Sequence, residues 1–248
     1  MNRPVVLITG GLTGIGRAAA VAFAKKGASV VVAGRRDDVG KALVKELRSL
    51  GSEAEFINAD VRKEDDVRAL VDKTVARFGR LDIAVNNAGT EGQPGPITDQ
   101  TAESYAATFE TNVLGVILSM KYEVRVMQRQ GSGNIINISS TYGHVGGAGA
   151  SLYVGSKHAV EGITKSVALE IAKSGIRMNG VAPGPTDTGM LTRFTGTLEN
   201  KAALTATVPM NRLGLTEELA DAIVFIASNE ASFITGHVLN VDGGRSVG

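Results

Sequence analysis

Short apolar runs alternate with helical patterns along the whole chain, and this alternation constrains the fold more than any other feature. The runs are almost continuously apolar, which is typical of parallel strands covered by helices on both faces. They lie at Val5–Thr9, Ser29–Gly34, Ala54–Asn58, Leu81–Asn86, Gly133–Ser139, Ile176–Ala182 and His237–Val241. Helical patterns such as Gly16–Gly27, Asp37–Leu50 and Glu64–Gly79 separate them. The sequence therefore predicts an α/β fold, a doubly wound, seven-stranded parallel sheet in three layers.

A chain of 248 residues fits one α/β domain, and it contains no evident linker, low-complexity tract or repeat. We therefore expect a single domain over residues 1–248. Between Gly184 and Arg212, glycines, prolines and short helical patches replace the regular alternation. Because this segment follows the carboxyl end of a predicted strand, we expect residues 184–212 to form a flexible substrate lid. A mobile surface insertion is the alternative.

The composition excludes several classes of protein. Without cysteine, the chain forms neither a disulfide nor a thiolate-ligated metal site, and we expect no metal. The 26 Lys and Arg nearly balance the 25 Asp and Glu, which leaves no basic footprint for nucleic acid. The apolar run Val5–Ile8 is too short for a signal peptide or a membrane span. We expect a cytoplasmic protein that binds neither nucleic acid nor membrane.

A glycine-rich loop, TGGLTGIG (Thr9–Gly16), joins the first predicted strand to the first predicted helix. Gly10, Gly14 and Gly16 allow a tight turn, a close approach of the backbone to a pyrophosphate, and close packing of the helix. The start of the helix adds unpaired N–H groups and the positive end of its dipole. A plain glycine turn is the alternative, but the strand–loop–helix setting favours dinucleotide binding.

The end of the second predicted strand indicates which dinucleotide is bound. An NAD site places an acidic residue there to bind the ribose 2′-hydroxyl, whereas this chain has Gly34 followed by Arg35 and Arg36. A guanidinium suits the 2′-phosphate of NADP. Asp37 and Asp38 could dilute this positive potential or contact a ribose, and a solvated basic pair is the alternative. We expect NADP (NADPH) in preference to NAD.

Tyr153 and Lys157 are four residues apart, so on a helix they share one face. Lys157 is the first formal charge after residues 130–156, which contain no Asp, Glu, Lys or Arg. An ammonium beside a phenol lowers the pKa of the phenol, and a cationic nicotinamide would add to this, so we expect Tyr153 to act as a general acid/base near neutral pH. Ser140 could hold a substrate carbonyl or alkoxide oxygen against it. An ordinary surface Tyr–Lys pair is the alternative.

Two asparagine segments are ambiguous on their own. Asn112 stands where a long apolar helix is expected to start, and alone it would be interpreted as a helix cap. The segment Asn86–Gly89 (NNAG) ends the fourth predicted strand, and alone it would be an Asn-rich turn.

Taken together, these segments resemble the short-chain dehydrogenase/reductase family over the whole chain. The resemblance rests on TGGLTGIG (Thr9–Gly16), Asp60-Val61, NNAG (Asn86–Gly89), Asn112, Ser140, YVGSK (Tyr153–Lys157), PGPTDT (Pro183–Thr188) and VDGG (Val241–Gly244). No single motif is decisive, but the ordered set is very specific. The resemblance implies a Rossmann-fold oxidoreductase that transfers a hydride reversibly between a nicotinamide and a carbonyl or secondary alcohol.

The resemblance also implies a role for each catalytic residue. Tyr153 would be the acid/base, Ser140 would orient the substrate oxygen, Lys157 would lower the pKa of the tyrosine and bind the nicotinamide ribose, and Asn112 would hold a water in a proton relay. The cofactor would contact Gly10, Thr13, Gly14, Ile15, Gly16, Gly34, Arg35, Arg36, Asp60, Val61, Asn87, Ala88, Gly89, Tyr153, Lys157, Pro183, Gly184, Thr186 and Thr188. Thr186 departs from the family, which more often has an apolar residue there, but its expected contact is through the backbone.

Members of this family are mostly homotetramers and sometimes dimers. The expected helix from Asn112 is apolar nearly all round, so a partner subunit would cover one face. We therefore expect a homotetramer or a dimer; burial under a loop of the same chain is the alternative.

The substrate is expected to be a small molecule bound between the loop 141–152 and the lid. Ser140, Tyr142, His144, Met190 and Phe194 are the candidate contacts, together with Thr141, Val145 and Leu191. With Arg193 as the only nearby cation, these residues suggest a neutral, fairly apolar ketone or alcohol. An NAD-dependent dehydrogenase of a sugar or polyol and an acyl-carrier 3-oxo reductase are the alternatives. A redox sensor without turnover or a Rossmann methyltransferase would have no use for the Ser140–Tyr153–Lys157 set.

Overall fold

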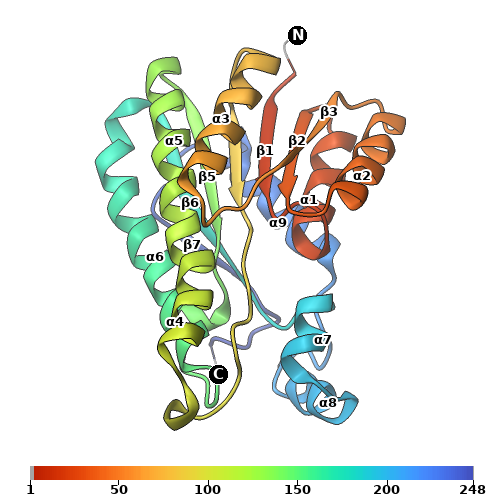
Figure 1. The fold of residues 1–248 in the computed structure, drawn as a ribbon, viewed down its shortest axis with the longest axis vertical. Coiled ribbons are helices and arrows are strands. Elements are labelled where there is room, and N and C mark those ends of the chain that lie inside the picture. Colours follow the sequence, from red (N-terminus) through yellow and green to blue (C-terminus); the bar gives the residue numbers. More distant parts are fainter. Residues whose placement is uncertain (1–2, 248) are drawn as a thin grey trace.

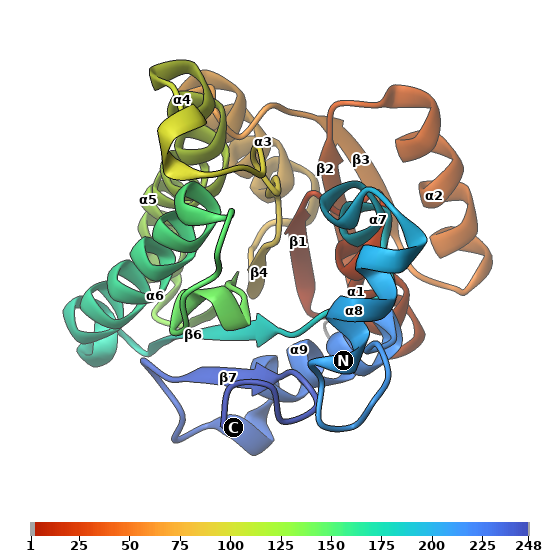
Figure 2. The same cartoon turned by 90° about the horizontal axis from the view of Figure 1, so that it is seen from below.

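The computed structural model describes residues 3–247; residues 1, 2 and 248 of the expected domain lie outside this range. Seven parallel strands form one sheet in the order β3-β2-β1-β4-β5-β6-β7 (Figures 1 and 2). They are β1 (Val5–Thr9), β2 (Ser29–Gly34), β3 (Ala54–Asn58), β4 (Ile83–Asn86), β5 (Gly133–Ile138), β6 (Ile176–Pro183) and β7 (Val238–Val241). This arrangement confirms the predicted doubly wound parallel sheet.

Helices cover both faces of the sheet. On one face, α1 (Gly14–Lys25), α2 (Asp37–Ser49) and α9 (Thr216–Ala227) form one apolar core with the strands. On the other, α3 (Glu64–Phe78), α5 (Gly115–Gln130) and α6 (Ser151–Ile171) form a second core (Figure 2). The central strands are buried on both faces, which explains why their sequences are continuously apolar rather than alternating.

The fourth strand begins two residues later than the sequence predicts. Leu81 is fully buried, but its backbone pairs with a side chain instead of a strand. Its N–H donates to Gln130 Oε1 at 2.9 Å, and its carbonyl accepts from Gln130 Nε2 at 2.8 Å. An apolar pattern cannot distinguish these amide bonds from a sheet ladder, since both satisfy the backbone.

The expected lid contains more regular structure than its sequence suggests. It forms α7 (Gly189–Thr195) and α8 (Leu198–Ala206), which lie at the carboxyl edge of the sheet, at the bottom of Figure 1. Threonine hydroxyls cap both helices: Thr188 accepts from the N–H of Leu191 at 3.2 Å, and Thr197 from that of Asn200 at 3.1 Å.

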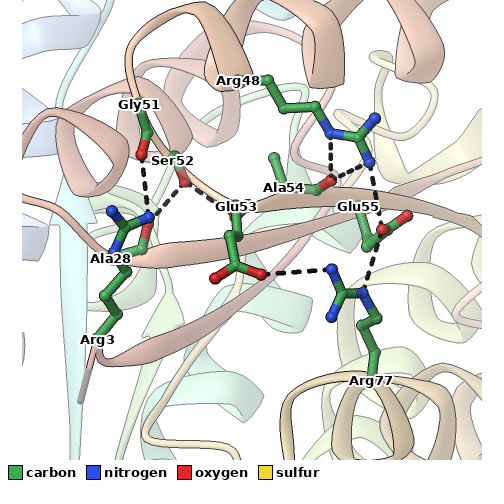
Figure 3. A network of polar contacts seen from close by, with 9 residues as sticks. All are labelled: Arg3, Ala28, Arg48, Gly51, Ser52, Glu53, Ala54, Glu55 and Arg77. Atoms are coloured by element: carbon green, nitrogen blue, oxygen red, sulfur yellow. Dashed lines mark hydrogen bonds and ion pairs between the residues drawn. The ribbon is translucent and has the colours of Figure 1, made fainter.

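The edge strand β3 is shielded by ion pairs and a capped carbonyl (Figure 3). Because the Glu53 carbonyl accepts from β2, the Ala54 carbonyl points away from the sheet, where Arg48 donates to it at 2.8 and 3.0 Å. Arg48 and Arg77 both pair with Glu55, at 3.2 and 3.4 Å. These charges and the occupied carbonyl prevent another strand from pairing with this edge.

A polar network lies inside the second core, beneath the carboxyl ends of β4 and β5. Asn86 Nδ2 donates at 3.0 Å to Glu123 Oε2 and to Asn137 Oδ1, and Asn137 Nδ2 donates to Thr164 Oγ1 at 2.9 Å. Burial raises the pKa of the Glu123 carboxyl to about 7, and the bond from Asn86 only partly opposes this shift.

In the described chain, no helix is both long and apolar enough to cross a membrane.

The contact between α2 and β3 gives a first prediction. A Cβ at Gly40 would overlap the ring of Phe56, whereas a Cβ at Gly162 on α6 would meet no described atom within 4 Å apart from the neighbouring backbone of its own helix. Replacing glycine by alanine inside a helix normally stabilises it, so Gly162→Ala should raise the free energy of unfolding by about 0.5–1 kcal/mol. Gly40→Ala should lower it by about 1–3 kcal/mol through overpacking. Urea denaturation of the wild type and both variants measures the free energy of unfolding. A change of the same sign in both variants would contradict the prediction.

Glu123 gives a second prediction, about pH. Its pKa in the folded state lies above the ordinary value of 4.5, so the folded protein binds more protons than the unfolded chain between these two values. Its contribution to stability is therefore complete below pH 4.5 and is lost as the pH rises through about 7. In the wild type, the free energy of unfolding should therefore fall with rising pH between these two values, by up to about 1.4 kcal/mol per pH unit, and Glu123→Gln should remove this dependence.

Urea denaturation between pH 5 and 8 tests this slope. The control is Glu170→Gln, since Glu170 is exposed on α6. Equal slopes for the wild type and Glu123→Gln would contradict the assignment.

Candidate active site

The turns after β1 and β4 meet where the strand order reverses, the position at which doubly wound sheets bind ligands. Gly10 has a φ of +61°, and a Cβ there would lie 2.7 Å from the Cα of Ala88. Asn87 Nδ2 donates to the Thr9 and Gly10 carbonyls at 3.2 and 3.0 Å. The close packing of these turns fixes the path of the glycine loop into α1.

The first turn of α1 is open to an anion. Thr13 is the N-cap residue, but its side chain makes no capping bond in the described structure. The N–H groups of this turn therefore remain available, with the positive end of the helix dipole behind them. The loop and the helix start fit a pyrophosphate.

A first cleft opens beside this loop, between the ends of β2 and β3 and the turn after β4. It is lined by Gly10, Leu12, Thr13, Ala33, Gly34, Arg35, Arg36, Ala59, Asp60, Val61, Arg62, Ala88, Gly89 and Thr111. At its rim, a Cβ on Gly34 would lie 2.7 Å from Leu12 Cδ1, so Leu12 occupies the space that a side chain at this strand end would need. Arg35 and Arg36 are exposed.

Two carboxylates near this cleft already have partners. Arg62 Nη2 lies 2.6 Å from Asp60 Oδ2, and this ion pair lowers the pKa of Asp60 to about 2. Asn58 Nδ2 donates to Asp37. Arg62 was not expected in this cleft, although it directly follows Asp60-Val61 in the sequence. The cleft thus gains a third guanidinium, while Asp37 is held by a neighbouring amide.

A second cleft lies on the other side of the loop, under α7 and α8, and shares Gly89 with the first. It is lined by Ile15, Asn87, Gly89, Thr90, Glu91, Ile138, Ser139, Ser140, Thr141, Tyr142, Tyr153, Lys157, Pro183, Gly184, Pro185, Thr186, Thr188, Met190, Leu191, Phe194, Leu204 and Arg245. The predicted set Ser140, Tyr153 and Lys157 is therefore together in one cavity.

The ends of β5 and α6 position these three side chains. Ser140 is the second residue after the end of β5, and its Oγ accepts from the N–H of Tyr142 at 3.2 Å. Tyr153 and Lys157 lie one turn apart on α6, with Lys157 Nζ 5.7 Å from the centroid of the Tyr153 ring. Lys157 Nζ also donates to the Ile138 carbonyl at 2.9 Å, which holds the ammonium at the strand end.

Burial determines the protonation of this pair. It raises the pKa of Tyr153 to about 12, and hydrogen bonding with Ser140 only partly opposes this. It lowers the pKa of Lys157 to about 8, against the attraction of Glu161. Lys157 is not among the groups that shift this pKa, so the expected lowering by Lys157 together with a cationic nicotinamide stays a prediction.

Asn112 is not a helix cap. It lies in a π-helical turn, Glu110–Leu114, between α4 (Ala102–Phe109) and α5. Its Oδ1 accepts from the Thr90 N–H at 2.8 Å, and its Nδ2 donates to the Thr90 carbonyl at 2.9 Å and to Ser156 Oγ at 3.0 Å. A Cβ at Gly89 would lie 3.4 Å from Asn112 Oδ1 and 3.7 Å from Lys157 Nζ, so all three groups adjoin. The wide turn places this fully buried amide behind Gly89, where it lines neither cleft and bonds to Thr90 and Ser156.

The substrate residues are only partly where the sequence analysis expects them. Tyr142, Met190 and Phe194 line the second cleft, whereas His144 does not. Instead, His144 Nδ1 lies 3.0 Å from Glu161 Oε2, and Glu161 Oε1 accepts from Ser139 Oγ at 2.7 Å. The buried carboxylate draws the imidazole toward α6, which corrects the expectation that His144 contacts substrate.

The charges around this cleft also differ from expectation. Arg193 does not line it; its guanidinium bonds to the Glu91 carboxylate at 2.5 and 3.1 Å. Glu91, Leu204 and Arg245 also line it, although none of them was expected there. Leu204 lies on α8 within the expected lid, and Arg245 directly follows the quoted VDGG segment (Val241–Gly244).

The remaining predicted residues support the clefts from behind. Gly14 and Gly16 line neither cleft: a Cβ at Gly14 would lie 3.4 Å from Thr188 Cγ2, and a Cβ at Gly16 would overlap the Asn87 amide. Within residues 3–247, no three His, Asp or Glu side chains are grouped to hold a metal ion.

The sequence matches a family model and known dehydrogenases over nearly its whole length. Residues 10–246 match the family described as enoyl-(acyl carrier protein) reductase. The chain is 41% identical over 243 residues to cis-4-hydroxycyclohexanecarboxylate dehydrogenase from Sinomonas cyclohexanicum, covering 97% of this chain and 95% of that one.

Two crystal structures share the fold at 34% identity. Levodione reductase has a TM-score of 0.96, with 98% of each chain covered. A variant of actinorhodin polyketide ketoreductase with NADPH has a TM-score of 0.94, covering 98% of this chain and 97% of that one.

A parallel sheet with this strand order, a hydroxyl–phenol–ammonium set at its carboxyl edge and relatives matched over nearly the whole chain lead to one assignment: the chain is an oxidoreductase of the short-chain dehydrogenase/reductase family.

Proposed function

We propose that this protein is an NADP(H)-dependent oxidoreductase that interconverts a small secondary alcohol and its ketone, with Tyr153 as the acid/base. The observation that carries the proposal is the presence of Ser140, Tyr153 and Lys157 in one cleft that shares Gly89 with the cleft beside the glycine loop. A bound nicotinamide would accept or donate the hydride at the substrate carbon.

The chain's own groups handle the proton. With a pKa raised to about 12, the Tyr153 phenol is protonated at neutral pH and can donate its proton to a carbonyl oxygen as that oxygen gains charge. The Ser140 hydroxyl would hold the same oxygen in position. In the reverse direction, the alcohol proton returns to the phenolate, which the Lys157 ammonium stabilises. Asn112 would hold a water in a proton relay that passes through Lys157.

The first cleft supports NADP over NAD. Leu12 fills the position from which an acidic side chain at residue 34 would reach a ribose 2′-hydroxyl, and Asp37 is bonded to Asn58. Arg35 and Arg36 remain exposed at the rim and suit a 2′-phosphate. The ketoreductase of the same fold is described with NADPH.

The second cleft supports a compact substrate with a ring. Its walls include the apolar side chains of Ile15, Met190, Leu191, Phe194 and Leu204. The relative from Sinomonas cyclohexanicum carries a hydroxycyclohexane in the name of its substrate. We therefore propose a cyclic secondary alcohol or ketone, with an acyl-carrier 3-oxo substrate as the alternative that the matched family description favours.

We further propose that the chain is a single domain with residues 184–212 as its lid, and that it forms a homotetramer or a dimer. Leu114 directly precedes α5 and Ile117 lies in its first turn, and each is 40% exposed. Leu169 on α6 is 82% exposed. We propose that a second copy of the chain covers these exposed apolar side chains.

Removing the Tyr153 hydroxyl tests the mechanism. Tyr153→Phe should lower kcat at least about a hundredfold, because the proton donor is lost, while the dissociation constant for NADPH changes little. Turnover is followed by NADPH absorbance on a panel of cyclic ketones and alcohols, and binding by fluorescence titration. Tyr105→Phe, a surface position that is 51% exposed, is the matched control. Undiminished turnover by Tyr153→Phe would overturn the mechanism.

Arg35→Asp tests the cofactor preference. It replaces the proposed phosphate contact by a repelling carboxylate, so NADPH should bind about ten- to a hundredfold more weakly while NADH binding is retained. Titration of both nucleotides measures this directly. Arg68→Asp, on the exposed side of α3, is the control. A wild type that binds NADH as tightly as NADPH would contradict the assignment.

A further inference from the structure

One cation in the second cleft has no part in the proposed hydride transfer. Arg245 lines the cleft from the short turn that follows β7. Its Nη2 lies 3.2 Å from the Tyr142 hydroxyl, and its guanidinium carbon lies 5.0 Å from the centroid of the Tyr142 ring. The other side chains at Tyr142 are Tyr153, with ring centroids 6.2 Å apart in an edge-to-face arrangement, and Phe194, at 6.4 Å. Tyr142 therefore connects the guanidinium to the reacting phenol.

The turn that carries Arg245 is fixed in place. The Asp242 carboxylate accepts from the N–H of Gly244 at 3.0 Å and from that of Ser246 at 2.9 Å. The Gly243 carbonyl accepts from the Met210 N–H at 3.2 Å, which joins the turn to the end of the lid. Asp242 thus uses its oxygens to shape the backbone, and within residues 3–247 it forms no ion pair with the neighbouring guanidinium.

The charges of the cleft do not cancel. Its charged lining residues are Glu91, Lys157 and Arg245. Glu91 is paired with Arg193, and Lys157 is buried against the Ile138 carbonyl. Within residues 3–247, Arg245 pairs with no carboxylate, so most of its donors are available to a ligand.

The surroundings strengthen this positive charge. Met190, Leu191, Phe194 and Leu204 make the wall of the cleft largely apolar. A charged hydrogen bond formed beside apolar walls is stronger than one formed in open water. A guanidinium also matches the two oxygens of a carboxylate better than a single ketone oxygen.

We propose that Arg245 is a substrate-recognition residue and that the substrate carries a carboxylate, which Arg245 binds while the reacting oxygen lies at Ser140 and Tyr153. The substrate class is then an anionic hydroxy or oxo acid on an apolar frame, rather than the neutral ketone or alcohol that the sequence suggests. This assignment rests on the proposed function, since it places the reacting oxygen at Tyr153.

The test compares two ligands that cannot react. Cyclohexanecarboxylate and cyclohexanecarboxamide have the same frame, and neither has a hydroxyl or ketone on the ring. Calorimetry with the full chain, saturated with NADP, should give at least about tenfold tighter binding of the carboxylate to the wild type. Arg245→Met should abolish this preference and leave the affinity for the amide unchanged.

Two further variants separate recognition from folding. Arg245→Lys keeps the charge but not the two-pronged geometry, so it should restore part of the preference. Arg212→Met removes a guanidinium near the end of the lid that pairs with Glu218 outside the cleft, so it should keep the full preference. Equal affinities of the wild type for the two ligands, or an undiminished preference in Arg245→Met, would overturn the assignment.

Turnover of hydroxycyclohexanecarboxylates, followed by NADPH absorbance, tests the proposed function separately. A carboxylate preference that depends on Arg245, without turnover, would support the recognition site and count against the oxidoreductase mechanism. Turnover of cyclic alcohols without any carboxylate preference would support the mechanism and overturn the role of Arg245.

Discussion

The close packing of the turns after β1 and β4 is the constraint on which the rest of the site depends. Gly10 can approach Ala88 only because it lacks a side chain, and Asn87 binds both carbonyls of the neighbouring turn. This contact sets the direction of α1 and therefore the position of its open N–H groups. It also separates the crevice into two clefts that share Gly89, one suited to a nucleotide end and one to the reacting centre.

Burial, more than the attraction between neighbouring charges, sets the chemistry of the second cleft. A phenol and an ammonium in open water would each keep an ordinary pKa, but here the two shift in opposite directions, because each neutral form is favoured away from solvent. The Ile138 carbonyl holds the ammonium with a neutral dipole at the end of β5. The carbonyl at the end of β5 thus fixes the position of Lys157, while burial lowers its pKa.

Most of the architecture could be predicted from the sequence, because buried parallel strands and amphipathic helices leave periodic patterns. Ser140, Tyr153 and Lys157 could also be found, since the spacing of a helix and the end of a strand bring them together. The sequence patterns did not predict two local features. The side chain of Gln130, instead of a neighbouring strand, pairs with the backbone of Leu81, and a π-helical turn changes the direction of Asn112. The patterns also failed for His144 and Arg245, whose positions depend on contacts between segments far apart in the chain.

The turn Asp242–Arg245 has a practical consequence. It lies at the carboxyl edge of the sheet, joined to the lid through Met210, whereas the chain enters the sheet at the opposite, amino edge through β1 (Figure 1). A purification tag fused directly after Val247 would begin within a few residues of Arg245 in the cleft wall and would bring its own histidines and charges to the cleft opening. A tag fused directly before Arg3 would be separated from that opening by the length of the sheet, and is the better choice for measuring substrate affinity.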